Sequence, residues 1–414
     1  MAASRTRVLQ RARRNCLVAA ILSAAGRVVL LFFAAGVSGA FAAAEPPVRA
    51  SPTRPNATPP GVEVRAPSPS APTERSPRPP APAKAASPKS PSPVVRSTQA
   101  QKQPSYIGSA DLARTLQLDQ RWVTPKRRVA FSDGPATLTL ERDQREVELN
   151  GLRVFLGEPA VWRDGEIAIS RIDFERLVLP ALRPTYLTDS PPALKVIALD
   201  PGHGGRDTGK VNPRLNVVEK EMTLDTARRL KVLLEAQGYQ VVMTRTEDRF
   251  VELAERSELA AAAKADLFIS LHFNAVEAEA SRVTGVEVYA MTPQYQLSAD
   301  QRRDEYVPVF NPGNAFDVWN AVVGYHVHRE LLAALKVPDR GFKRSRHAVL
   351  RLARCPAILV EAGFLSHDGE ARRVSEPQYR QEIAVAIAAG VKNYAATLAL
   401  VRSQSGVSGK TAKK

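Results

Sequence analysis

The stretch VIALDPGHGGRDTGK, residues 196–210, begins as an apolar strand and ends in a glycine-rich turn around one histidine. Glycine-rich turns that follow strands commonly bind phosphate through their backbone N–H groups. A histidine in the turn favours a metal ion instead, provided that other parts of the chain supply further ligands. The choice between a phosphate site and a metal site therefore depends on the partners of His203.

Apolar strands and amphipathic helices alternate after the turn, which is the pattern of an α/β fold with helices on both faces of a sheet. The expected strands are 194–199, 240–245, 266–274, 286–291, 347–351 and 357–361, and the expected helices are 221–237, 253–264, 316–336 and 378–400. Residues 191–400 are therefore predicted to form one α/β catalytic domain. Residues 401–414 are predicted to be a disordered basic tail.

Polar side chains lie at the ends of three of these apolar strands. His203 follows VIALDPG, His272 lies in DLFISLHFNA, and Glu361 closes AILVE. The carboxyl ends of strands in an open α/β sheet meet at one crevice, where ligands bind. Glu219 begins the helix after the first strand and is directed to the same edge. We therefore expect these four side chains to lie close together.

Two histidines and one carboxylate, with a fourth position open, are the ligands of a hydrolytic zinc site. The sequence predicts one Zn²⁺ per chain, held by His203, Glu219 and His272. Glu361 would then serve as general base, because a second carboxylate can take a proton from water and pass it to the leaving amine.

Several blocks of the sequence, in order, resemble the zinc-dependent N-acetylmuramoyl-L-alanine amidases of bacterial cell-wall hydrolysis. They are LDPGHGGRDTG, EKEMTLDTARRLKVLLEAQGYQVVMTR, ADLFISLHFNA, GVEVYA and CPAILVEAGFLSH, and they span about residues 194–397. The resemblance implies zinc ligation by His203, Glu219 and His272, and catalysis by Glu361. It also implies cleavage of the amide between N-acetylmuramic acid and the L-alanine of the peptidoglycan stem peptide.

Two alternatives stay open at this stage. One is another zinc peptidase that cuts within the stem peptide, and the other is a catalytically inactive wall-binding protein. The second is disfavoured because an inactive protein is free to lose any of the four residues. Peptidoglycan is the expected partner in each case, and a regulatory protein partner stays unknown.

The remaining histidines and Cys355 are expected to have structural roles. His326 and His328 lie two residues apart on a predicted helix and so face different sides, which prevents joint chelation of one ion. His367 is expected in an exposed loop, and for His347 a contact with the cleft stays open. Cys355, at the start of an apolar strand, is predicted to be a small buried hydrophobic residue.

Residues 1–42 have the features of a signal peptide. Five arginines precede residue 15, an apolar run follows, and small residues near Ala42 offer a cleavage site. The segment predicts export to the periplasm or cell envelope, and an uncleaved membrane anchor is the alternative.

Residues 43–104 are rich in proline, serine and alanine, and are predicted to be a disordered linker. The net charge of +16 comes largely from the N-terminal part, with six Arg in 1–42 and nine Lys or Arg against three Glu in 43–104. The basic linker would be weakly attracted to anionic envelope surfaces. No nucleic-acid partner is expected, because the positive charge does not belong to a folded face.

Residues 105–190 alternate apolar and polar residues around turn signals and contain no His or Cys. They predict a small α+β or mostly β accessory domain. The segment resembles the copper-amine-oxidase-N-terminal-like domain found beside cell-wall enzymes. That resemblance implies a docking role without catalysis.

Overall fold

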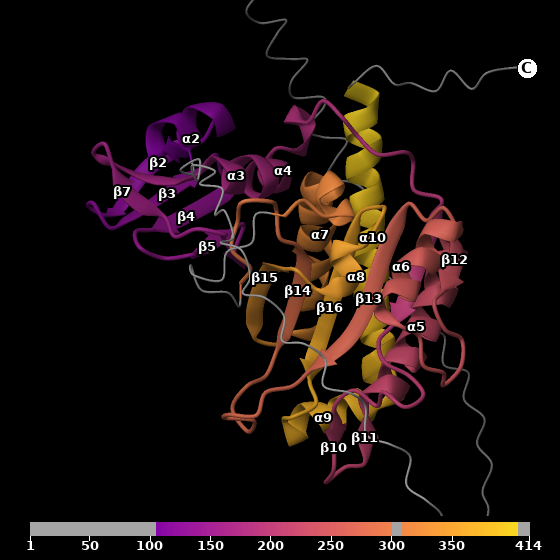
Figure 1. Cartoon of the computed structure of the whole chain (residues 1–414). Helices are drawn as coiled ribbons and strands as arrows, with labels where there is room; N and C mark the ends of the chain where they lie inside the picture. The colour runs from indigo at the N-terminus through magenta and orange to yellow at the C-terminus, as the bar shows by residue number, and fades with distance from the viewer. Residues whose placement is uncertain (1–104, 300–308, 405–414) are drawn as a thin grey trace, which may run out of the picture. The chain divides into compact units, whose positions relative to one another are not determined.

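The computed structural model describes residues 105–299 and 309–404, which all belong to one compact unit of the chain (Figure 1). The predicted signal peptide (1–42), the predicted linker (43–104) and residues 405–414 of the predicted tail lie outside the described residues. Their assignments stay predictions.

A mixed sheet forms the centre of the α/β region. Its strands, in spatial order, are β12 (Gln240–Met243), β9 (Val196–Pro201), β13 (Leu267–Asn274), β16 (Ala357–Phe364), β14 (Val286–Met291) and β15 (Asp339–Ser345). The first four are parallel, whereas β14 runs antiparallel to β16 and parallel to β15. The carboxyl ends of β9, β13 and β16 therefore meet at one edge, as expected.

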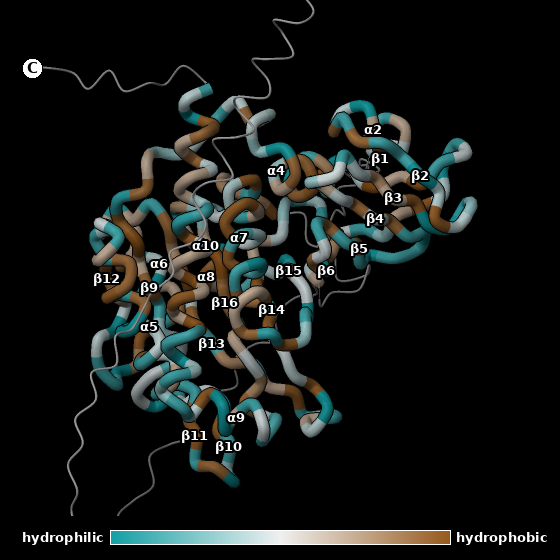
Figure 2. Tube along the Cα trace, turned by 180° about the vertical axis from the view of Figure 1, so that it is seen from behind, coloured by the Kyte–Doolittle hydropathy of each residue, from teal (hydrophilic) through white to brown (hydrophobic). Residues whose placement is uncertain are grey.

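Helices cover both faces of this sheet. Helix α10 (Pro377–Gln404) packs against both α5 (Glu219–Ala236) and α7 (Asp317–Leu335), and the three helices share the main buried cluster with one face of the sheet. On the other face, α6 (Leu253–Ala262) and α8 (Ala348–Arg351) contribute to a second buried cluster. Because side chains alternate along a strand, Ile269 of β13 joins the first cluster and Phe268 the second. Apolar residues concentrate along β9 and β16 (Figure 2). The predicted α/β class is confirmed.

Helix α10 is long and apolar enough to cross a membrane by length and composition. In this structure its apolar residues Ile383, Ile387 and Val391 are buried in the core that it shares with α5 and α7. The length and hydropathy of α10 are therefore those of a core helix.

One predicted strand is wrong. Residues 347–351 were expected to be extended, but Ala348–Arg351 form the single helical turn α8, which buries Val349 and Leu350 in the second cluster. The strand of this region is instead β15, which ends at Ser345, two residues before the predicted strand begins. Its sequence DRGFKRS is too polar to show an apolar pattern, yet Arg344 and Ser345 are buried there.

Residues 105–190 form a β-rich region that continues the same sheet. An antiparallel meander comprises β2 (Asp119–Thr124), β3 (Arg128–Ser132), β4 (Thr137–Glu141), β5 (Glu146–Leu149) and β6 (Leu152–Phe155). Strand β6 pairs with β15 through Val154 and Phe342. A second sheet holds β1 (Tyr106–Gly108), β8 (Glu166–Ser170) and β7 (Val161–Arg163), beside the short helix α2 (Ser109–Leu116). The predicted β-rich character is confirmed.

Candidate metal centre

Two buried arginines fix the glycine-rich turn after β9 by donating hydrogen bonds to its backbone carbonyl groups. Arg245 donates to the carbonyl of Gly202 at 2.8 Å, and Arg256 donates to the carbonyl of His203 at 2.9 Å. Arg256 also pairs at 2.7 Å with Asp200, a fully buried carboxylate on β9. Because the turn is fixed through its carbonyl groups, His203 is held at the edge of the sheet with a positive φ of 62°.

Two glycines let the ligand side chains approach the turn. A Cβ on Gly202 would lie 2.2 Å from the imidazole of His272. A Cβ on Gly209, which has a positive φ of 62°, would lie 2.6 Å from the carboxylate of Glu219 and equally close to the His203 ring. Any larger residue at either position would push a ligand side chain away.

His203, Glu219 and His272 bring three donor atoms together. His203 Nε2 lies 3.0 Å from Glu219 Oε1, His272 Nδ1 lies 3.1 Å from the same oxygen, and the two nitrogens are 3.2 Å apart. Zn²⁺ with ligands at 2.0–2.1 Å in tetrahedral geometry separates neighbouring donors by about 3.3 Å. The triad therefore has the donor types and the spacing that a metal ion of this kind requires, and it is the group in the described residues that could hold one.

Asp207, which the sequence analysis did not single out, orients His203. Its Oδ2 lies 2.9 Å from His203 Nδ1, which leaves Nε2 directed at the triad. A carboxylate on the outer nitrogen of a ligand histidine fixes the ring and raises its basicity. The sequence feature that could have identified Asp207 is its position in the same turn, four residues after the histidine.

Glu219 is buried at the first turn of α5, with its side chain fixed by backbone donors. Oε2 accepts from the N–H of Lys210 at 2.8 Å, and Oε1 accepts from the N–H of Phe273 at 3.1 Å. Burial alone would raise the pKa of this carboxyl, but hydrogen bonds from His203 and His272 outweigh burial and lower the pKa far below its usual range. Glu219 is therefore a carboxylate at neutral pH.

Glu361 lies beside His272 in register, on the neighbouring strand β16. Its Oε2 is buried and accepts no hydrogen bond within the described residues. Burial and the nearby carboxylates of Glu219 and Glu287 raise the pKa of Glu361 well above its usual value. The side chain lines one cleft of about 500 Å³ together with the triad. The four residues predicted to lie together thus share one cavity.

Glu287, on β14, is a second carboxylate that sequence analysis did not assign. It pairs in register with Glu361 from the other side. Burial would raise its pKa, but Lys343 at 2.6 Å and Arg340 at 3.2 Å lower it. Glu287 therefore stays charged and repels negative charge on Glu361. The sequence feature that could have identified Glu287 is a charged residue at an inward position of the otherwise apolar strand GVEVYA.

The other histidines have partners outside the triad. His326 contacts Thr397 Oγ1 at 2.9 Å, His328 contacts Asp339 at 2.8 Å, His347 packs edge-on against Tyr289 with ring centroids 5.0 Å apart, and His367 accepts from the N–H of Glu370 at 3.2 Å. His326 and His328 face different sides of α7, as expected. Burial raises the pKa of Cys355 to about 12, which agrees with its prediction as an inert buried residue.

Residues 197–393 match the family model described as N-acetylmuramoyl-L-alanine amidase. The match begins in β9 and ends in α10, so it contains the triad and Glu361. The blocks that carried the sequence resemblance lie within or at the borders of this match.

Curated relatives agree with the family match. The chain is 34% identical over 227 residues to the N-acetylmuramoyl-L-alanine amidase AmiC of Neisseria meningitidis, covering 50% of this chain and 54% of that protein. It is 33% identical over 200 residues to LytC of Bacillus subtilis, covering 48% of this chain and 35% of that protein. The chain thus spans about half or less of the length of these relatives.

Two further matches cover most of the other protein. The chain is 30% identical over 200 residues to the uncharacterized protein YqiI of Bacillus subtilis, covering 48% of this chain and 84% of that protein. A crystal structure of an N-acetylmuramoyl-L-alanine amidase from Clostridium difficile is 30% identical, with a TM-score of 0.41, over 49% of this chain and 97% of that one.

Proposed function

This chain belongs to the N-acetylmuramoyl-L-alanine amidase family, and we propose that it hydrolyses the amide between N-acetylmuramic acid and L-alanine in peptidoglycan. The observation that carries the proposal is the convergence of His203, Glu219, His272 and Glu361 on one cleft. The proposal includes action in the cell envelope, after export directed by residues 1–42.

The metal we propose is one Zn²⁺, held by His203, Glu219 and His272. The donor spacings of 3.0–3.2 Å and the carboxylate character of Glu219 support this choice. Zinc in such a site supplies Lewis-acid chemistry, which lowers the pKa of water and polarises a carbonyl group. Asp207 would keep the His203 ring in the ligating orientation.

Glu361 is proposed as the general base and acid. Its unpaired Oε2 faces the cleft, where it can take a proton from the attacking water and later give it to the departing L-alanine nitrogen. Positive charge at the triad would lower the pKa of Glu361 again, because opposite charges nearby favour the ionised form. Because burial raises the pKa of Glu361 in the absence of that charge, the side chain can both accept a proton and return it.

Mass spectrometry of the products from purified peptidoglycan tests the reaction. Zinc-loaded protein is expected to release stem peptides with a free L-alanine amino terminus and leave glycan with an unmodified lactyl carboxyl. New amino termini within the stem peptide would identify a peptidase instead. Peptidoglycan left intact by the zinc-loaded protein would contradict the proposed activity and favour a wall-binding role.

Metal content should follow the ligand assignment. His203→Ala and His272→Ala are each expected to lose bound zinc, because each removes one of three protein ligands. Asp207→Asn should keep the site but weaken zinc affinity by about 10–100-fold, as expected for loss of the carboxylate behind a ligand histidine. Equilibrium dialysis with elemental analysis measures both effects, with His326→Ala as the control outside the triad. Full zinc occupancy in His272→Ala would remove the proposed ligand set.

A further inference from the structure

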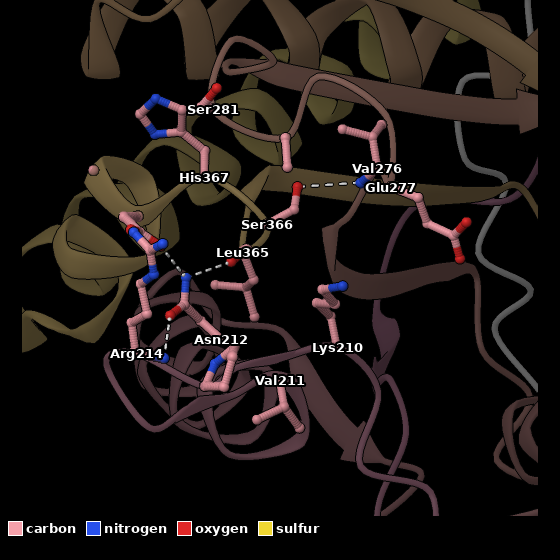
Figure 3. Close-up of a pocket in the computed structure, with 14 residues that line it drawn as sticks. Lys210, Val211, Asn212, Arg214, Val276, Glu277, Ser281, Leu365, Ser366 and His367 are labelled. Carbon is pink, nitrogen blue, oxygen red and sulfur yellow. Dashed lines mark hydrogen bonds and ion pairs between the residues drawn. The ribbon is translucent and has the colours of Figure 1, made fainter.

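A second hollow of about 410 Å³ adjoins the metal cleft (Figure 3). Its walls are β10 (Val211–Asn212) with the residues on either side of it, the loop after β13, and the segment that leads from β16 into α9 (Asp368–Ser375). Lys210, Val276 and Glu277 line both cavities. The triad cleft and the second hollow are therefore two parts of one continuous groove.

Lys210 is placed at the junction by direct bonds to a predicted metal ligand. Its N–H donates to Glu219 Oε2 at 2.8 Å, and its carbonyl accepts from the N–H of Glu219 at 2.9 Å. The backbone of Lys210 thus moves with the triad. The fixed backbone keeps the base of the Lys210 side chain beside the triad, at the junction of the two cavities.

The ammonium group of Lys210 has no ion pair or hydrogen bond in the part of the chain that the structure describes. The other charges of the second hollow differ in this respect. Arg214 pairs with Asp368 at 3.0 Å, and Asp368 also accepts from Asn212 at 3.0 Å. Glu277 is exposed, and Figure 3 shows its carboxylate directed away from Asn212 and Arg214. Lys210 is therefore the cation left available for a ligand.

The proposed substrate is negatively charged on one side of the scissile bond. The lactyl carboxyl of N-acetylmuramic acid is consumed in the amide, whereas the stem peptide beyond L-alanine carries free carboxylates. A cation next to the triad is complementary to the peptide side and has no charged partner on the glycan side. The charge of the substrate therefore favours one orientation in the groove, with the stem peptide on the side of Lys210.

We propose that Lys210 binds a stem-peptide carboxylate, so that the peptide lies along the second hollow and the glycan leaves the cleft on the opposite side. This inference rests on the proposed function and names a specificity residue for it. A hydrogen-bonded ion pair of this kind is expected to strengthen binding by roughly tenfold. Lys210 would position the substrate without taking part in bond cleavage.

The test uses the full zinc-loaded chain and two soluble substrates, an N-acetylmuramoyl tetrapeptide with free carboxyl groups and the same compound with every carboxyl amidated. Wild type is expected to show a KM about tenfold lower for the free acid. Lys210→Met should raise KM for the acid to the value for the amide and leave kcat nearly unchanged. Lys210→Arg should restore most of the preference, and Lys392→Met, an exposed lysine on α10, should retain it.

The outcomes separate this inference from the proposed function. If Lys210→Met keeps the wild-type preference for the acid, the inference is wrong while the amidase activity stands. A lower kcat on both substrates with unchanged KM would also overturn it, because Lys210 would then act in the chemistry. Failure of the zinc-loaded wild type to cleave either compound would count against the proposed function itself, and against the inference with it.

Discussion

Glu361→Gln should retain zinc and lower kcat by roughly 10²-fold to 10⁴-fold, the range that general acid–base catalysis typically contributes. Glutamine preserves the shape of the side chain beside His272 but cannot accept the proton of the attacking water. None of the three proposed zinc ligands is altered. Elemental analysis and kcat on soluble muropeptides measure the two effects separately.

The same substitution should leave stability unchanged or raise it. Glu361 lies in register with charged Glu287 and near Glu219, with a buried oxygen that lacks a hydrogen-bond partner in the described residues. Removing its ionisable group removes like-charge repulsion and the cost of burying a charge. Glu258→Gln, at an exposed position on α6, is the matched control and should change neither kcat nor Tm. A fall in kcat of less than tenfold for Glu361→Gln would assign the base elsewhere.

The position of the site could be predicted because it depends on local pattern. Polar residues at the ends of apolar strands placed His203, His272 and Glu361 at one edge, since parallel strands align their carboxyl ends. Arg245 and Arg256 could not be found in this way. Each acts through contacts with segments distant in sequence, and each alone looks like an ordinary surface charge until its burial is known.

The sheet topology could not be predicted where a strand buries polar side chains. Strand β15 carries Arg344 and Ser345 into the interior, so its residues lack the alternation by which strands are recognised. The same strand joins the two predicted domains, because β6 pairs with it. The sequence predicts that residues 105–190 form a separate accessory domain, and that boundary stays a prediction.

Contacts across this junction are buried and specific. Arg344 pairs with Asp173, and both side chains are almost fully buried. Asn150 donates to Tyr325 at 2.8 Å, and the N–H of Arg153 donates to Asp339 at 2.8 Å. The apolar residues of both regions belong to one continuous cluster. Residues 105–190 therefore complete the core and cover the edge of β15.

Deletion of residues 1–190 is accordingly expected to yield a protein that aggregates or unfolds. The deletion removes Asp173, the ion-pair partner of Arg344, and exposes β15 as an open edge, which favours pairing between chains. Deletion of residues 1–104 alone is the control, because it keeps every contact across the junction. Size-exclusion chromatography and thermal unfolding of the two proteins compare them directly. A monomeric, cooperatively folded 191–414 would show that the predicted domain is independent.

Asp173→Ala tests the same junction in the full chain. Removing one partner of a buried ion pair typically costs about 3–5 kcal/mol, because the other charge stays buried without compensation. A loss of that size would lower Tm by roughly 5–10 °C in a region of this length. Asp111→Ala, which breaks the exposed pair with Arg114, should cost less than about 1 kcal/mol. Equal effects of the two substitutions would mean that the buried pair does not hold the two regions together.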